Sequence, residues 1–295
     1  MKIFYLKNNF GPIDFLLARL FFRRKKTVRR ESKIYYALKL ILKYMCTLSF
    51  YPKPTEKGAF ILTFSRDETP KRSSVEVVKD VERGLIFPKD VLHGGSWLAI
   101  SERTGRVTCL LNGAFLLHER QLPYRKSRGL VLLESFDYAQ PIDFCKRYNL
   151  HNIEPFTMLL LENQQFIELK WDGTHRHIRL LSLSIPQIWS SATLYDPSVQ
   201  SRRKTWFYNF LDKNVGNVNA LDMWQLHKTE QKDEPENGFL MRRPSGVQTV
   251  SLTQMTISNK VQTIKFQYNE LGTNDIQRQY IAFGHANAHP TEGSF

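Results

Sequence analysis

The sequence has little cysteine, no long apolar run near its start and no internal repeat. Its 295 residues include only 3 cysteines. This number excludes a fold held together by disulfides and fits a reducing compartment, so we expect a cytoplasmic protein. A membrane-spanning helix needs about 20 mostly apolar residues. The apolar runs at 15–18 and 20–22 are much shorter and are separated by Arg19, which predicts no transmembrane segment.

Sequence patterns for metals and covalently attached groups are missing as well. The sequence contains no Cys-x-x-Cys-His, which excludes covalent haem attachment. His175 and His177 would share one face of a strand, but no third ligand is evident near them. His285 and His289 have helical spacing, but they lie in a region without periodicity. We therefore expect no metal site and no resident cofactor.

Charge is unevenly distributed along the chain. The 42 basic residues outnumber the 28 acidic ones and give a formal net charge of +14. Residues 1–44 hold 12 of the basic and 2 of the acidic residues, so this segment carries +10 and the rest of the chain only +4. A strong positive field would indicate a nucleic acid or an anionic membrane as partner. The small excess after residue 44 predicts no nucleic-acid partner.

The basic segment 1–44 leaves three interpretations open. Its basic block at 23–30 comes after the apolar stretch, whereas a signal peptide has its charges before it. The segment could be a basic amphipathic arm that binds a membrane surface or nucleic acid. It could also be an appended tail without a folded role, or an upstream stretch outside the mature protein. We favour the last two, and expect an extension that is unstructured or absent from the mature protein.

Periodicity predicts an α+β fold from residue 45 onward. Apolar runs bounded by turn residues predict strands, and apolar residues at helical spacing predict helices. The elements come in runs rather than in strict strand–helix alternation, which favours αββα layering over a doubly wound parallel sheet. Predicted strands cover 45–51, 59–64, 97–101, 106–111, 156–162, 165–171, 177–183, 246–258 and 260–268, and predicted helices lie within 127–148, 198–211 and 220–227.

The connecting segments complete the predicted organisation. Residues 65–68 are predicted to form a loop after the second strand, and 228–237 form a long exposed loop. Periodicity is lost near the end of the chain, which predicts a tail at 271–295. The expected domain therefore covers 45–270.

The dipeptide Met45-Cys46 carries the most specific chemistry. Translation from Met45 and removal of that methionine would leave Cys46 as the first residue. Its thiol is a nucleophile, and a free α-amine with a pKa of about 8 can take the thiol proton. A peptide nitrogen is not basic, so this chemistry requires a free amine on Cys46. The alternative is a small residue that fills a buried strand, the role we expect for Cys109 and Cys145.

Short motifs from Met45 onward resemble those of the NRDE family and come in the same order. This family includes the transport and Golgi organisation protein. The sequence MCT at 45–47 opens the first strand, and SRDE at 65–68 follows the second. The resemblance covers about residues 45–268 and leaves 1–44 unmatched. The other matching blocks are GGSWLAIS at 94–101 with GR at 105–106, LN at 111–112, SRG at 127–129, WSSATL at 189–194 and TV at 249–250.

This resemblance implies a four-layer αββα sandwich of the N-terminal-nucleophile hydrolase type, related to the choloylglycine hydrolases. It implies Cys46 as the nucleophile and Arg66 as a group that tunes the thiol or binds an anion. Asp67 would hold the α-amine, and Asn112 would donate into an oxyanion hole. The substrate-binding residues implied by the same motifs are Ser65, Glu68, Trp97, Ser190 and Ser191.

Three positions depart from the family's motifs. Ser65 and Ser191 stand where the family has asparagine, although a hydroxyl can still donate a hydrogen bond. The segment GVQ at 246–248 lacks the arginine that the family carries there.

Three functions of different classes follow. The leading hypothesis is an amide (C–N) hydrolase with an N-terminal cysteine and a small acyl amide as substrate. The alternative is a non-catalytic trafficking protein that uses the same cleft for haem or a lipid, with haem as cargo. The third is a protein that acts at a membrane or nucleic-acid surface through its basic arm. The sequence leaves the substrate and the oligomeric state open.

We predict that the natively produced protein has the mass of a chain beginning at Cys46, because only then is the Cys46 amine free. Intact-mass spectrometry of protein from its natural source measures this directly. A mass beginning at Met1 would leave the hydrolase hypothesis without its base.

Overall fold

The computed structural model describes residues 45–70, 76–216, 218–273 and 276–284, so the predictions for 1–44 lie outside this part. All strands pair antiparallel in two sheets. The first sheet has the order β10 (Gln187–Ser190), β1 (Met45–Pro52), β2 (Phe60–Glu68), β11 (Gln248–Ser258), β12 (Thr263–Glu270), β13 (Ile276–Ala282). The second has the order β3 (Glu76–Asp80), β4 (Leu85–Lys89), β5 (Leu98–Ser101), β6 (Val107–Asn112), β7 (Phe156–Glu162), β8 (Gln165–Trp171), β9 (Arg176–Leu180).

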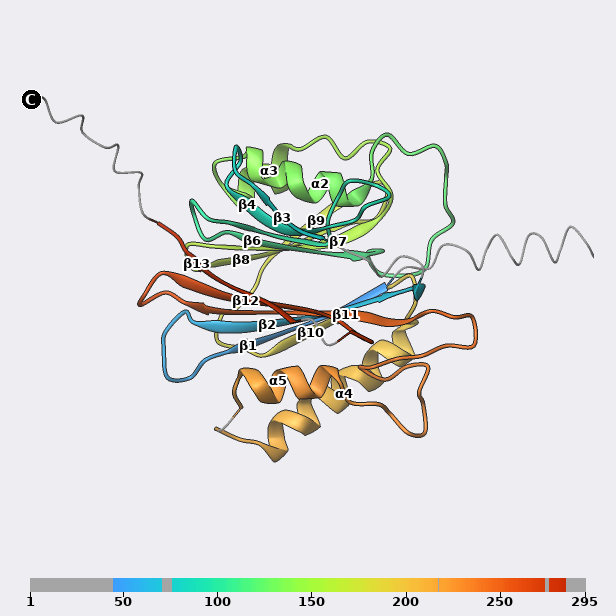
Figure 1. Cartoon of the computed structure of the whole chain (residues 1–295). Coiled ribbons are helices and arrows are strands. Elements are labelled where there is room, and N and C mark those ends of the chain that lie inside the picture. The colour runs from blue at the N-terminus through green and yellow to red at the C-terminus, as the bar shows by residue number, and fades with distance from the viewer. Residues whose placement is uncertain (1–44, 71–75, 217, 274–275, 285–295) are drawn as a thin grey trace, which may run out of the picture. The chain divides into compact units, whose positions relative to one another are not determined.

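Helices cover the outer faces of the two sheets (Figure 1). The described residues form four α-helices: α2 (Arg128–Glu134), α3 (Pro141–Arg147), α4 (Pro197–Lys213) and α5 (Ala220–His227). A 3-10 turn, η2 (Ser135–Asp137), links α2 to α3. Helices α2 and α3 lie on the second sheet and α4 and α5 on the first, so the layers run helix, sheet, sheet, helix (Figure 1). The α+β class and the sandwich arrangement agree with the sequence prediction.

Three apolar cores separate these layers. The largest lies between the sheets and includes Leu48 and Phe64 from the first sheet and Leu159 from the second. A second core joins α2 and α3 to the outer face of the second sheet, and a third joins α4 and α5 to the first. Strand β2 is buried along its whole length because it is covered on both faces. The cores therefore place the centre of the first sheet deep inside the protein.

The predicted helix at 220–227 and the strands at 156–162 and 165–171 have the bounds of α5, β7 and β8. Helix α4 also agrees with the prediction to within two residues at each end. Its first turn is capped by Asp196, whose carboxylate accepts from the backbone N–H groups of Ser198 at 2.8 Å and Val199 at 2.9 Å. These elements carry strong local signals, namely caps and clear apolar periodicity.

Other sequence predictions were wrong. Residues 65–68, predicted as a loop, form the end of β2, because their polar side chains find partners inside the protein. The predicted tail at 271–295 contains β13, which pairs with β12, while residues 274–275 and 285–295 of this segment lie outside the described residues. Only Ile281 of β13 is buried, so this edge strand has almost no apolar periodicity. Strands β3 and β4 were missed; β3 is nowhere fully buried, and β4 carries a proline.

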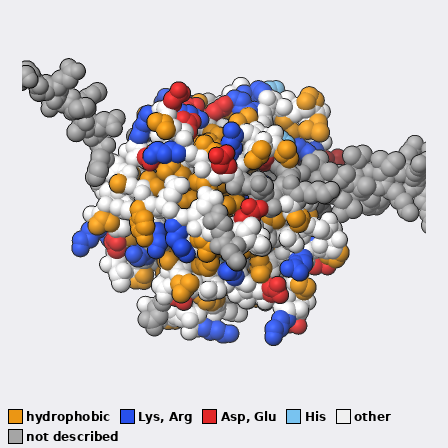
Figure 2. Space-filling model, in the orientation of Figure 1, with side chains coloured by type: hydrophobic (Ala, Val, Ile, Leu, Met, Phe, Trp, Pro, Cys, Tyr) orange, Lys and Arg blue, Asp and Glu red, His pale blue; other side chains and the backbone are white. Residues whose placement is uncertain are grey.

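On the face in view (Figure 2), the described residues form no large surface patch of one charge. Figure 2 shows basic and acidic side chains interspersed there rather than gathered by sign. Among the described residues, no helix is long and apolar enough to cross a membrane.

We predict that Phe50→Ala lowers the free energy of unfolding by about 3–5 kcal/mol, the usual cost of a phenylalanine cavity. Phe50 of β1 is fully buried, and its ring centroid lies 4.8 Å from that of Phe166 in β8, so it joins the two sheets. Urea denaturation measures the loss. Tyr280→Ala is the control, because Tyr280 is 72 % exposed and should cost less than about 0.5 kcal/mol. Equal effects would show that Phe50 is not a packing centre.

Candidate active site

Cys46 lies in β1, in the core between the sheets, and is 8 % exposed. Its partner across the ladder is Arg66 of β2. The Arg66 guanidinium stacks on Trp97, with 4.3 Å from its carbon to the ring centroid. Arg66 Nη2 also lies 3.8 Å from Glu68 Oε2. Cys46, Arg66, Glu68 and Trp97, all predicted as site residues, are thus brought together on the inner side of the first sheet.

The thiol is held in its neutral form. Burial, followed by the nearby Asp67 carboxylate, raises the pKa of Cys46 well above its usual range. The Arg66 guanidinium and a hydrogen bond from the Asp67 backbone N–H lower this pKa in part. Thiols react as thiolates, so any reaction of the Cys46 thiol would require a base that removes its proton.

Arg128 carries a second guanidinium that is weakly coupled to the thiol, and sequence reasoning did not assign it a role. It opens α2, and a thiolate on Cys46 would raise the pKa of Arg128 slightly. Its Nη2 lies 3.3 Å from Glu154 Oε2, and its Nη1 donates to the backbone O of Pro155 at 3.1 Å. Burial lowers the pKa of Arg128. The matching SRG motif was the signal that could have identified this residue.

A close backbone contact fixes Arg128 relative to Trp97. A Cβ on Gly95 would lie 2.6 Å from the carbonyl carbon of Gly129, so only glycine fits at Gly95. The Ser96 N–H donates to the Gly129 carbonyl at 3.3 Å. The GGS and SRG motifs therefore pack against each other, although 33 residues lie between Gly95 and Gly129.

Asn112 and Ser191 join the two sheets beside Cys46. The Ser191 hydroxyl donates to the backbone O of Asn112 at 2.6 Å. The Ser191 N–H donates to the backbone O of Cys46 at 3.0 Å. Of these two predicted site residues, Ser191 is therefore bonded to the Cys46 backbone, and Asn112 is bonded to Ser191.

Asp67 and Ser65 direct their side chains to the helix side of the sheet, because neighbouring residues of a strand alternate between its faces. The Asp67 carboxylate accepts from the Thr249 hydroxyl at 2.7 Å and from the Tyr195 hydroxyl at 3.2 Å. The Ser65 hydroxyl lies 2.7 Å from His227 Nδ1. These side chains support β2 from behind, while the backbone N–H of Asp67 reaches the thiol.

A buried histidine links β1 to β2 on that helix side. His227 Nε2 lies 2.7 Å from the Ser49 hydroxyl, opposite the contact to Ser65. Burial lowers the pKa of His227 to about 3, so its ring is neutral near pH 7. A neutral ring donates through one nitrogen and accepts through the other, which satisfies both serines.

Ser190 is held by Arg203, a fully buried residue of α4 that the sequence did not indicate. Arg203 Nε donates to the Ser190 hydroxyl at 2.9 Å, and its Nη2 donates to the Thr47 hydroxyl at 2.5 Å. Its guanidinium also stacks on Tyr195, 4.2 Å from the ring centroid. Arg203 thus ties β1 to β10 through the hydroxyls of Thr47 and Ser190.

The described residues contain no group of three His, Cys, Asp or Glu that could hold a metal ion. Residues 45–274 match the family model described as Transport and Golgi organisation 2. No curated protein matches the chain significantly.

Asp67 is expected to make stability depend on pH. Burial raises the pKa of Asp67 to about 6, above the value of about 3.9 in an unfolded chain. The folded state therefore binds this proton more tightly, and the stability gained below pH ~4 is lost as the pH rises through about 6. We predict that the unfolding free energy of the wild type, relative to Asp67→Asn, falls by about 2 kcal/mol from about pH 4 to pH 7. Urea denaturation across this range measures it, and a constant difference would contradict it.

Proposed function

The chain belongs to the transport and Golgi organisation 2 family, and we propose that it is an amide hydrolase with Cys46 as its N-terminal nucleophile. The observation that carries this proposal is the environment of Cys46. Its thiol lies between the two sheets, where the Arg66 guanidinium of the paired strand favours the thiolate and the charge of Arg128 at the start of α2 is weakly coupled to it. The layer order of helix, sheet, sheet, helix, which the family resemblance leads us to expect, supports the same type of hydrolase.

The base is the α-amine of Cys46 in a chain that begins at this residue. Because the pKa of the Cys46 thiol is raised, the thiol is not ionised before the reaction. Its proton must therefore leave as the sulfur attacks. Cys46 stands at the second position of β1, next to the end of the strand. Removal of the preceding residues would expose its amine without breaking the ladder beyond it.

Acylation and deacylation then follow in order. The amine takes the thiol proton while sulfur attacks the amide carbonyl carbon, and a C–S bond forms. The amine passes this proton to the amide nitrogen, the C–N bond breaks, and the amine product leaves a thioester on Cys46. Water attacks the thioester, its proton passes through the α-amine to sulfur, and the C–S bond breaks to release the carboxylic acid.

The neighbouring residues have roles that fit this reaction. Asn112 is tied to the Cys46 backbone through Ser191, and its amide would donate to the oxyanion of the tetrahedral intermediate. The Trp97 indole N–H is buried without a hydrogen-bond partner among the described residues, so it is a donor for a substrate oxygen. Arg66 and Arg128 favour a substrate with an anionic group near its scissile bond.

Ser65, Asp67 and Ser190 act from the rear of the sheet in this proposal. Their side chains bind His227, Thr249 and Arg203, respectively, and not the reacting atoms. They hold β1, β2 and β10 in register, while Glu68 holds Arg66 in place.

The alternative is a non-catalytic protein that carries haem or a lipid at the Cys46 site. This function needs neither a free amine on Cys46 nor a nucleophilic thiol. Loss of Cys46 would leave such binding intact, which separates the two proposals by experiment.

We predict that a thiol-reactive acyl probe labels Cys46 in protein that begins at this residue. Protein that retains residues 1–44 should react at least about 100-fold more slowly, because it lacks the amine that acts as general base. Peptide mass spectrometry locates the label, and Cys46→Ser should abolish it. Cys109→Ala is the matched control and should leave labelling unchanged, because Cys109 is a fully buried core residue. Absence of labelling together with stoichiometric haem uptake would refute the hydrolase.

A further inference from the structure

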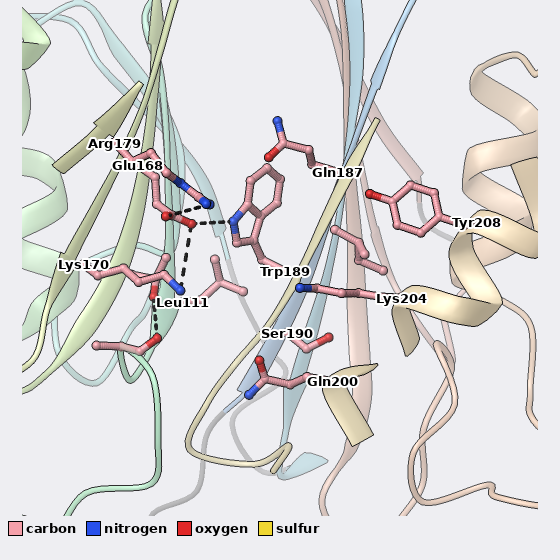
Figure 3. Close-up of a pocket in the computed structure, with 13 residues that line it drawn as sticks. Leu111, Glu168, Lys170, Arg179, Gln187, Trp189, Ser190, Gln200, Lys204 and Tyr208 are labelled. Atoms are coloured by element: carbon pink, nitrogen blue, oxygen red, sulfur yellow. Dashed lines mark hydrogen bonds and ion pairs between the residues drawn. The ribbon is translucent and has the colours of Figure 1, made fainter. Parts of the chain in front are cut away.

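A polar groove opens at one edge of the sandwich. Of the site residues predicted from the sequence, only Ser190 lines it. It has a volume of about 240 Å³ and is lined by both sheets and by α4. Figure 3 shows β8 and β9 on one side of it and β10 and α4 on the other. Its lining includes neither Cys46 nor Arg66 nor Trp97. The groove is therefore a second candidate site, beside the strand that carries the nucleophile.

The charges in this groove do not balance. Its lining contains three cationic side chains, Lys170, Arg179 and Lys204, and one carboxylate, that of Glu168, so the net charge is +2. Arg179 Nη2 lies 3.0 Å from Glu168 Oε2, and Lys170 Nζ lies 4.0 Å from Glu168 Oε1. The Trp189 indole N–H also donates to Glu168 Oε1, at 2.8 Å. One carboxylate is thus shared among two cations and an indole.

Lys204 is the cation that Glu168 does not reach. Within the part of the chain that the structure describes, no carboxylate pairs with it. Figure 3 shows its amine pointing into the groove from α4. Lys170 is only 22 % exposed, and burial together with the charges of Arg179 and Lys204 lowers its pKa. An anion between these three side chains would relieve their mutual repulsion.

We propose that this groove binds a doubly charged oxyanion, the phosphate group of a phosphate monoester, between Lys170, Arg179 and Lys204. A phosphate dianion matches the +2 charge and accepts charge-assisted hydrogen bonds from all three side chains. Trp189 and Leu111 offer apolar surface to the organic part of the ligand. A compact dicarboxylate carries the same charge, and the test below separates the two.

The proposal does not depend on the chemistry of Cys46. The groove and the thiol are neighbours, since Ser190 in the groove pairs across the ladder with Thr47. Binding in the groove nevertheless needs no free amine and no thiol. Cys46→Ser protein should therefore bind the anion as the wild type does, so that failure of the hydrolase and failure of this site can be told apart.

The test is a titration of the full chain with phenyl phosphate, followed by NMR of ¹⁵N-labelled tryptophan. The Trp189 indole N–H reports on the groove because it donates to Glu168, and Trp189→Phe assigns its signal. Phenyl phosphate at a pH where it is dianionic should shift this signal with saturation. Benzoate has the same ring with a single charge and should bind at least about tenfold more weakly. A stronger response to succinate would assign the groove to dicarboxylates and overturn the phosphate assignment.

Matched variants locate the binding. Lys204→Gln should weaken phenyl phosphate binding about tenfold, whereas Lys213→Gln, the same change on the same helix outside the groove, should not alter it. Glu168→Gln should strengthen binding, because its amide oxygen still accepts from Trp189 while the competing charge is gone. No saturable shift of the Trp189 signal, or equal losses in both lysine variants, would overturn the proposal.

Discussion

Strands β1 and β2 are covered on one face by the second sheet and on the other by α4 and α5, so no polar group on them can rely on water. A buried polar side chain without a partner costs free energy, so each needs a bond inside the protein. The helices supply two of the main partners, Arg203 from α4 and His227 from α5. Strand β11 supplies another through Thr249. The helix layer is thus a set of hydrogen-bond partners for the central strands as well as an apolar cover.

Strand alternation divides the polar residues of β2 between two tasks. Arg66 and Glu68 face the second sheet and lie near the thiol, whereas Ser65 and Asp67 face the helices. One short motif therefore supplies both the site and its support. Ser65 belongs to the supporting side, where its hydroxyl contacts His227.

The Cys46 site and the polar groove at the edge of the sandwich share one electrostatic property. Each contains more than one cationic side chain in a partly desolvated setting, where an anion gains more than it does in open water. Strand β10 lies between them, with Ser190 in the groove and Ser191 bonded to the Cys46 backbone.

Local patterns in the sequence were enough to predict the strands at β7 and β8, the helix α5 and the α+β class, because periodicity and caps act over a few residues. The family motifs pointed to Cys46 and to its partner Arg66. The motifs did not show which of residues 65–68 face the thiol and which face the helices. These residues were predicted as a loop, and side chains alternate between two faces only within a strand.

The sequence by itself determined the order of the motifs and the chemistry available at Cys46. Only the tertiary structure decided which charges surround it. Arg128 is 82 residues from Cys46 along the chain, and the groove collects its cations from β8, β9 and α4. Such groups meet because two sheets and a helix layer pack their apolar faces together, and the free energy of that burial depends on the whole fold rather than on local sequence.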